Sequence, residues 1–299
     1  MKIPTIPLFA AASAVAALHC SAQSTISDPN KFAWSGNTGW MNFRPSAVDG
    51  VITGERFLSG YVWAANTGWI RMGSGTPANG YAFANNSATD YGVNHDGAGN
   101  LTGLAWSANT GWVNFGWATA NDPNRPRFDL VSGNFSGYAW SANTGWVNLG
   151  AGFLKTSQIL CVDTDGDGMG DAWELQHFGN LTTAGVGTDH DHDGQSDAAE
   201  YAADTDPNNS REFLRIVSQT YNAGFTQATL QFTTTQPSRL YRIQRSTTLL
   251  ATGTGAWADI GSPVLFTPDP GTTTSKTITI PGGLPRQFFR VVAVKPLQP

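Results

Sequence analysis

The stretch Phe32-Ala-Trp34-Ser-Gly-Asn-Thr-Gly-Trp40-Met-Asn-Phe43 is the first of four copies of one motif in the amino-terminal half of the chain. The other copies span residues 61–72, 104–115 and 138–149, and the four together hold eight of the 11 tryptophans. Each copy reads as a strand, a tight turn at Asn-Thr-Gly and a second strand, because glycine readily supplies the left-handed residue of such a turn. We therefore predict a β-hairpin repeat domain over residues 30–152, either closed into a ring or stacked openly. Further strands are expected at residues 50–57, 90–95 and 127–131.

The register of each hairpin is predicted from its hydrophobic pattern. A four-residue loop, residues 36–39, places Trp34 opposite Met41 and gathers the large apolar side chains on one face. The first tryptophan of each copy is then expected in the core, and the second on the opposite face with small residues and amides. We favour packing between repeats as the role of the second tryptophans, and keep open a flat platform for sugar rings. These candidate ligand platforms are Trp40, Trp69, Trp112 and Trp146.

Two acidic stretches follow the repeats, and they begin at Asp163 and Asp189, 26 residues apart. Both fit D-x-D-x-D-G-x-x-D-x-x-E, the loop that wraps a calcium ion. Carboxylates at positions 1, 3 and 5 converge, glycine at position 6 permits the sharp turn, and position 7 offers its backbone carbonyl. Position 9 usually acts through a water, and glutamate at position 12 closes the shell. The candidate ligands are Asp163, Asp165, Asp167, Met169, Asp171 and Glu174 in the first loop and Asp189, Asp191, Asp193, Gln195, Asp197 and Glu200 in the second.

The charge distribution also favours bound cations. Residues 163–206 hold 12 of the chain's 22 acidic residues and no lysine or arginine, whereas the rest of the chain has a net charge of +7. Without a cation, the carboxylates of each loop would repel one another at short range. We therefore expect two Ca²⁺ ions. His190 and His192 occupy positions 2 and 4, which point outward, so we interpret them as solvent-facing residues rather than zinc ligands.

A short helix is expected after each loop, at residues 172–178 and 198–203. This loop-then-helix pattern resembles the tandem calcium repeats of dockerins and the thrombospondin type 3-like segments of large secreted bacterial proteins. The resemblance implies a calcium-binding segment over residues 160–209. We interpret it as a stiff connector, because such loops have little apolar surface of their own and fold around the metal. The Trp-rich motif likewise resembles repeats in large secreted or surface proteins of bacteria.

Residues 211–299 alternate apolar and polar side chains between turns, which predicts an antiparallel β-sandwich. Its strands are expected at residues 213–217, 228–233, 239–245, 256–260, 276–280 and 287–294. The segments around Tyr241, Trp257 and Phe288 resemble fibronectin type III-like modules, which implies a spacer or attachment role. The whole chain is thus predicted to be mainly β, with two β domains joined by a calcium-binding connector.

Residues 1–22 predict an export signal, because Lys2 precedes an apolar run and Cys20-Ser-Ala22 offers small residues for cleavage. We therefore expect the protein to be secreted or held at the cell surface. Cys161 is then the only remaining cysteine, so no disulfide within the mature chain is expected. No later apolar run is long enough to cross a bilayer.

The sequence offers no clear catalytic constellation. It lacks a nucleophile motif, a phosphate-binding loop and a zinc-spaced set of histidines and cysteines. We expect a non-catalytic, calcium-binding modular protein with a structural or adhesive role at the cell surface or in the matrix, and no nucleic-acid partner. The alternative is a carbohydrate-binding accessory protein that uses the tryptophan platforms on a polysaccharide or envelope glycan. An extracellular glycan hydrolase is the third hypothesis.

Overall fold

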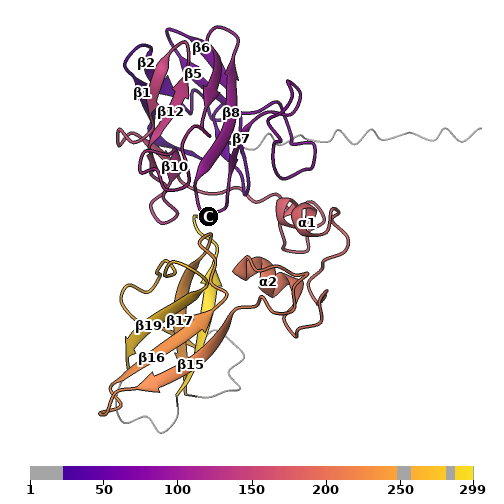
Figure 1. The fold of residues 1–299 in the computed structure, drawn as a ribbon, viewed down its shortest axis with the longest axis vertical. Helices are drawn as coiled ribbons and strands as arrows, with labels where there is room; N and C mark the ends of the chain where they lie inside the picture. The colour runs from indigo at the N-terminus through magenta and orange to yellow at the C-terminus, as the bar shows by residue number, and fades with distance from the viewer. Residues whose placement is uncertain (1–22, 248–256, 281–286, 299) are drawn as a thin grey trace, which may run out of the picture.

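The computed structural model describes residues 23–247, 257–280 and 287–298. The predicted signal segment, residues 1–22, lies outside the described residues. The protein is mainly β, with antiparallel sheets, as predicted. In Figure 1 a barrel formed by the repeats lies above a smaller sandwich, and two short helices lie beside the junction between them.

The four repeats close into an eight-stranded antiparallel barrel. Each repeat forms one hairpin, neighbouring hairpins pair with each other, and the last strand pairs with the first. The open question of ring or stack is therefore answered by a ring, and this part of the chain is a barrel rather than a sandwich. Its strands are β1 (Ile26–Ser35), β2 (Gly39–Asn42), β5 (Tyr61–Ala64), β6 (Gly68–Arg71), β8 (Leu101–Ser107), β9 (Gly111–Asn114), β12 (Tyr138–Ser141) and β13 (Gly145–Asn148).

Short strands in the connections between repeats cover the lower end of the barrel. Three of them coincide with the segments expected before the later repeats, although they are shorter than predicted. They are β3 (Ile52–Thr53), β4 (Leu58–Ser59), β7 (Val93–His95), β10 (Arg127–Phe128), β11 (Phe135–Ser136) and β14 (Leu154–Thr156).

The predicted hairpin register is wrong. The loop has three residues rather than four, so Ser35 pairs with Gly39 and Trp34 pairs with Trp40. The same register recurs in the other three repeats. Both tryptophans of each repeat therefore point outward, and the first tryptophan of each copy is not in the core. They are Trp34, Trp40, Trp63, Trp69, Trp106, Trp112, Trp140 and Trp146, each between 37% and 49% exposed.

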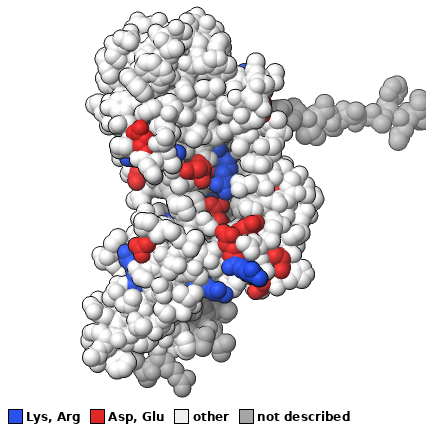
Figure 2. Space-filling model, viewed as in Figure 1, with Lys and Arg blue, Asp and Glu red and all other residues white. Residues whose placement is uncertain are grey.

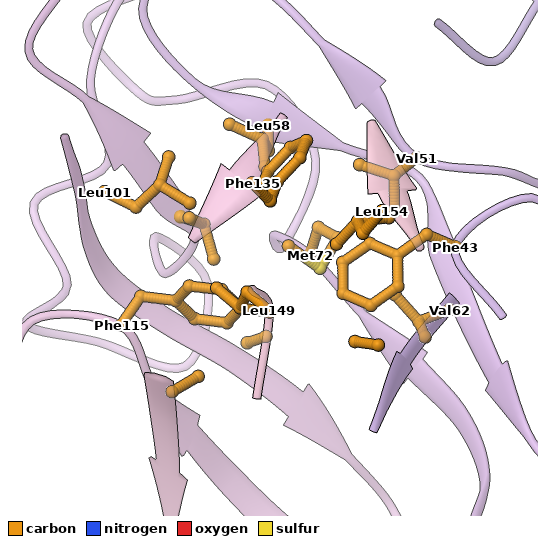
Figure 3. Packing of buried hydrophobic residues seen from close by; sticks show 14 of the residues in the cluster. Phe43, Val51, Leu58, Val62, Met72, Leu101, Phe115, Phe135, Leu149 and Leu154 are labelled. Atoms are coloured by element: carbon orange, nitrogen blue, oxygen red, sulfur yellow. The ribbon is translucent and has the colours of Figure 1, made fainter. Parts of the chain in front are cut away.

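The size of the barrel explains this register. An eight-stranded barrel has an interior only just wide enough for its own side chains, so eight indoles would not fit inside it. Each repeat instead points one fully buried alanine inward from its first strand: Ala33, Ala64 (two residues further along the strand in its copy, where Val62 takes the position of Ala33), Ala105 and Ala139. Larger apolar residues from the second strands and the connections fill the remaining space, and Figure 3 shows part of this cluster, including Phe43, Met72 and Phe115.

The Asn-Thr-Gly turns also join neighbouring repeats. Each asparagine donates a hydrogen bond from its side-chain amide to the threonine carbonyl of the preceding turn, and the first turn bonds to the last. The four bonds are Asn37 to Thr144 (3.1 Å), Asn66 to Thr38 (3.1 Å), Asn109 to Thr67 (3.0 Å) and Asn143 to Thr110 (2.9 Å). The glycine that follows each threonine has a positive φ, between 74° and 79°, which a residue with a Cβ adopts only with strain. The motif therefore encodes both the turn and the closure of the ring.

The carboxyl-terminal part contains two three-stranded antiparallel sheets that share one apolar core, which confirms the predicted β-sandwich. One sheet has the order β15-β16-β19 and the other β18-β17-β20. The strands are β15 (Arg215–Tyr221), β16 (Gln227–Thr233), β17 (Leu240–Ser246), β18 (Ala258–Ile260), β19 (Thr273–Thr279) and β20 (Phe288–Val294). After β20 the chain returns to the barrel, where the Leu297 carbonyl accepts a hydrogen bond from the Ile159 amide at 3.0 Å.

Between the barrel and the sandwich lie α1 (Asp171–His177) and α2 (Asp197–Ala203), each following one acidic loop as predicted. Their packing is mutual: Trp173 of α1 is completely buried and its ring lies 5.3 Å from that of Tyr201 in α2. Met169 and Ala184 complete this small apolar cluster. The connector therefore has a core of its own, although a very small one.

Candidate metal centre

Each acidic loop brings three aspartates together at positions 1, 3 and 5. In each triad, one carboxylate oxygen from every residue lies within 4.8 Å of the others. Either triad could hold a metal ion. The triads are Asp163, Asp165 and Asp167 in the first loop and Asp189, Asp191 and Asp193 in the second.

Hydrogen bonds within the loops hold the carboxylates in place. Both oxygens of Asp163 accept backbone N–H bonds, from Gly166 at 2.7 Å and Gly168 at 3.0 Å. In the second loop Asp189 accepts the equivalent bond from Gly194 at 3.0 Å, and its other oxygen accepts from the position 5 amide of Asp193 at 3.2 Å rather than from position 4. Position 6 glycine has a φ of 94° in the first loop and 95° in the second, as the sharp turn requires. The two loops therefore have one geometry.

Position 9 braces the loop in both cases. Asp171 accepts hydrogen bonds from the Thr164 amide (2.7 Å) and hydroxyl (2.5 Å). Asp197 accepts from the His190 amide at 3.0 Å and the Thr188 hydroxyl at 2.5 Å. Because both oxygens of each carboxylate are engaged in this way, position 9 ties the end of the loop to its beginning.

Position 12 is left without partners. Glu174 and Glu200 are 0% and 1% exposed, yet neither oxygen of either carboxyl group has a hydrogen-bond partner. One oxygen each of Asp167, Asp191 and Asp193 is also buried without a partner. Burying an unpaired carboxylate is strongly unfavourable, so these seven oxygens require a cation or a proton.

The pKa values of the two glutamates also indicate that these carboxyl groups require a cation or a proton. Burial, followed by repulsion from the neighbouring aspartates, raises the pKa of Glu174 to about 7 and that of Glu200 to about 8. Burial and the same neighbours also raise the pKa of Asp191. The residues present therefore fit a hard cation that takes oxygen ligands.

The remaining predicted site residues lie as follows. Met169 and Gln195 occupy position 7 of their loops, where the backbone carbonyl is the candidate ligand, and the Met169 side chain is buried in the connector core. His190 and His192 are exposed, as predicted for positions 2 and 4.

The second loop differs from the first in what its helix contacts. Asp204, which follows α2 in the left-handed conformation, pairs with Arg56 of the barrel at 3.0 Å and with Arg239 of the sandwich at 3.6 Å. Arg239 also donates to the carbonyls of Ala202 (2.9 Å) and Tyr201 (2.8 Å) at the end of α2. Burial alone would raise the pKa of Asp204, but the two guanidinium groups outweigh it and hold that pKa below its usual value.

A second group of contacts links the same helix to the barrel and to the segment after β20. Lys295, just after β20, pairs with Glu55 of the barrel at 2.9 Å and lies over the Tyr201 ring, whose hydroxyl accepts a hydrogen bond from its amine. The Cys161 sulfur lies 2.8 Å from the same hydroxyl. Burial and then the Glu55 carboxylate raise the pKa of the Cys161 thiol, so Cys161 stays protonated in this position. We call the contacts of Glu55, Arg56, Tyr201, Asp204, Arg239 and Lys295 the α2 junction.

Figure 2 shows the charged side chains gathered in the middle of the molecule, while the far end of the barrel carries almost none on this face. Nothing in the sequence pointed to the α2 junction, because its partners lie as far apart as Glu55 and Lys295 and no local pattern records such contacts. A different signal was overlooked: Trp117 stands immediately after the third repeat, and its ring contacts the candidate platform Trp146 at 4.7 Å.

The four candidate platforms are all on the outer wall of the barrel, so the structure brings them onto one surface but not into one site. Each packs at a steep angle against the first tryptophan of its own repeat, with ring centroids 4.6 to 4.9 Å apart. Three of them also contact a ring from outside their own repeat: Trp40 contacts Phe153, Trp112 contacts Tyr91 and Trp146 contacts Trp117.

No family model, no curated protein and no solved structure matches this chain. Among the described residues, neither helix is long and apolar enough to span a bilayer.

Proposed function

We propose that this protein is a secreted, non-catalytic, calcium-binding modular protein with a structural or adhesive role at the cell surface or in the matrix. The observation that carries the proposal is that seven of the eight buried carboxylate oxygens without partners, among the described residues, lie in the two acidic loops; the eighth belongs to Asp90. The proposal is also supported by the resemblance of these loops to dockerin and thrombospondin type 3-like repeats, and by the export signal.

Calcium suits these loops better than other common metals. Ca²⁺ takes six to eight oxygen ligands in a flexible geometry, whereas Mg²⁺ keeps several waters and Zn²⁺ prefers nitrogen and sulfur. Each loop offers five carboxylates and one backbone carbonyl, and the nearby histidines point to solvent. The ions would be held by the twelve residues that the spacing predicts, with Glu174 and Glu200 completing the two sites.

A bound ion would supply positive charge to the carboxylates and so fix the position of each following helix. For the second loop this has a wider effect, because α2 begins with the ligands Asp197 and Glu200 and ends in the α2 junction. Calcium would therefore hold the barrel and the sandwich in one arrangement. A rigid spacer of this kind suits a protein that projects a binding surface away from its attachment point.

Isothermal titration of the mature protein with Ca²⁺ tests the proposal, and two ions per chain are expected. The double substitution Asp163→Ala with Glu174→Ala should lower that number by one and expose the connector to protease. The substitution Asp122→Ala, in the barrel and outside the two loops, is the control and should leave the number at two. An unchanged stoichiometry in the double variant would reject the first site.

A second candidate function is polysaccharide binding, favoured by the eight exposed tryptophans on the barrel wall. Monomeric proteins rarely expose this much aromatic surface without a partner for it. Tryptophan fluorescence during titration with soluble polysaccharides tests this function. If Trp40→Ala combined with Trp112→Ala leaves the affinity for every bound polysaccharide unchanged, these two positions are not part of the binding surface.

A further inference from the structure

Trp146, the second tryptophan of the fourth repeat, stands beside a wall that the loop after the third repeat supplies. Beside Trp146 the barrel wall is hollowed by about 310 Å³, and the hollow is lined by Trp117, Asn124, Tyr138 and Trp146. The geometry points to this hollow as the binding site for an uncharged sugar ring of a polysaccharide. The inference rests on the second candidate function above and gives it a location.

The hollow is built by the loop that joins the third and fourth repeats. The Trp117 indole N–H donates to the Tyr138 carbonyl at 2.5 Å, and the Tyr138 amide donates to the Asn124 carbonyl at 2.9 Å. The loop is itself braced, since the Asn124 amide donates to Asp122 and Arg125 donates to the Ala120 carbonyl. The walls are thus held in place before any ligand binds, which reduces the entropy lost on binding.

Three rings give the hollow its shape. The Trp117 and Trp146 rings lie 4.7 Å apart and meet at 69°, and the Tyr138 and Trp146 rings lie 6.2 Å apart and meet at 77°. The result is an open corner rather than a flat plate. A pyranose ring can place its C–H face on one indole and its edge against the neighbouring ring.

The polar groups beside these rings indicate the kind of ligand. Within the described part of the chain, neither the Asn124 carboxamide nor the Tyr138 hydroxyl has a hydrogen-bond partner in the protein, and no charged side chain lines the hollow. An amide and a phenol both donate and accept, as recognition of sugar hydroxyls requires. An organic cation would be attracted by the rings, but it would lack a carboxylate to balance its charge. The charge of the lining therefore matches a neutral sugar.

Trp69 provides a matched control. It occupies the same motif position as Trp146 and is equally exposed, at 47% against 46%. Among the described residues, however, its ring contacts are only with Trp63 and Tyr61 of its own repeat. The two positions differ in the wall that Trp117 and Asn124 supply.

The test uses the calcium-loaded mature protein and a set of neutral hexasaccharides: β-1,4-glucan, β-1,3-glucan, β-1,4-xylan and chitin fragments. For those that bind, Trp146→Ala should weaken binding by about tenfold or more, as the loss of one aromatic stacking surface does elsewhere. Asn124→Ala, at an exposed loop position that the fold does not need, should weaken binding about threefold, as the loss of one hydrogen bond predicts. Trp69→Ala should stay close to wild type.

Three other results would each contradict the proposed sugar site in a different way. Equal losses in Trp146→Ala and Trp69→Ala, with Asn124→Ala unchanged, would overturn the hollow as the site and leave polysaccharide binding by the barrel wall intact. Competition by choline chloride would overturn the assignment in favour of a cation. If no neutral hexasaccharide and no neutral polysaccharide binds the wild-type protein, the second candidate function fails together with the site.

Discussion

The barrel and the connector are both built by repetition, but they differ in the polar groups that repetition leaves without partners. In the barrel, every Asn-Thr-Gly turn receives and donates a hydrogen bond within the ring, and the buried groups left over in these turns are the neutral hydroxyls of Thr38, Thr67 and Thr144. In the connector, the repeated loops leave buried carboxylate oxygens without partners. Repetition of a neutral polar motif thus leaves only neutral groups without partners in the turns, whereas repetition of an acidic motif gathers negative charge that a cation could balance.

The apolar core of the barrel is also much larger than that of the connector. The barrel buries a large cluster of residues from every repeat, while the cluster of the connector has only four buried members: Met169, Trp173, Ala184 and Tyr201. A core of that size contributes little hydrophobic stabilisation. Under the proposed function, bound ions and the contacts with the two domains supply the remaining stability of the connector.

Removal of calcium should show the difference in stability between the barrel and the connector most clearly. At a calcium concentration about a hundredfold above Kd, two sites contribute roughly 5 kcal/mol of stability, all of it to the connector. Chelation should make residues 160–209 sensitive to protease and lower the melting temperature of the connector. The tryptophan fluorescence of the barrel should be unchanged. Calorimetry and limited proteolysis with and without EDTA measure this. A barrel that melts together with the connector in EDTA would show that the barrel is not independent.

The two loops can next be compared with each other through Glu174→Gln and Glu200→Gln. In saturating calcium each variant loses one ion and about 3 kcal/mol. Glu200→Gln should also speed hydrogen exchange in Arg239 and the tail after β20, because α2 no longer holds the α2 junction. Glu174→Gln should confine its effect to the first loop and α1.

Measurement of Glu174→Gln and Glu200→Gln in EDTA provides a control for the loss of calcium. Without calcium, both glutamines should be neutral or stabilising, because they remove a buried carboxyl group that neighbouring aspartates repel. Equal exchange at Arg239 in the two calcium-loaded variants would contradict a special role for the second loop.

Features formed by residues that are close in the sequence were predicted, whereas contacts between distant residues were not. The two aspartate triads were predicted, because their members lie within five residues of one another and the spacing alone brings them together. The strands of the sandwich were predicted for the same reason, since alternation is local. The α2 junction could not be predicted, because Arg56, Asp204 and Arg239 meet only after the whole chain has folded.

The error in the hairpin register has a different cause. The pattern of large apolar residues was assumed to face inward, but barrel closure limits the interior volume, and closure depends on all four repeats at once. The buried residues Ala33 and Ala105 were the informative ones, because small residues on the first strand of a repeat leave room inside a narrow barrel for the larger residues of the second strand. Size rather than hydrophobicity decided which face of the strand is buried.

Acid should affect the barrel through one buried group, independently of calcium. His95 is buried, with Nε2 2.6 Å from the Gly54 carbonyl and Nδ1 accepting from the Gly97 amide at 3.1 Å. Burial lowers its pKa to about 4, aided by Arg56 and opposed by the Gly54 carbonyl and the carboxylates of Asp96 and Glu55. The folded state thus keeps His95 neutral, whereas the unfolded chain takes up a proton below about pH 6.5.

The sign of the effect follows directly. Because the unfolded state binds more protons between pH 6.5 and pH 4, the free energy of unfolding should fall through that range by roughly 3 kcal/mol at most and be constant above it. Urea unfolding of wild type and His95→Gln at fixed calcium, followed by barrel fluorescence at pH 7 and pH 4.5, measures the difference. Parallel losses in the two proteins would assign the acid sensitivity to other groups.

The smallest effect concerns the seam where the ring closes. Asn37→Ala removes the bond between the first and last turns, and Asn109→Ala removes the equivalent bond between the second and third. Each loss should cost about 1 to 2 kcal/mol, since one neutral hydrogen bond is lost and its acceptor carbonyl belongs to a buried threonine, Thr144 or Thr67. Equal costs are expected because β13 pairs with β1 by the same kind of ladder that joins the other repeats. A much larger cost at Asn37 would mean that closure, rather than the sum of equivalent contacts, limits the stability of the barrel.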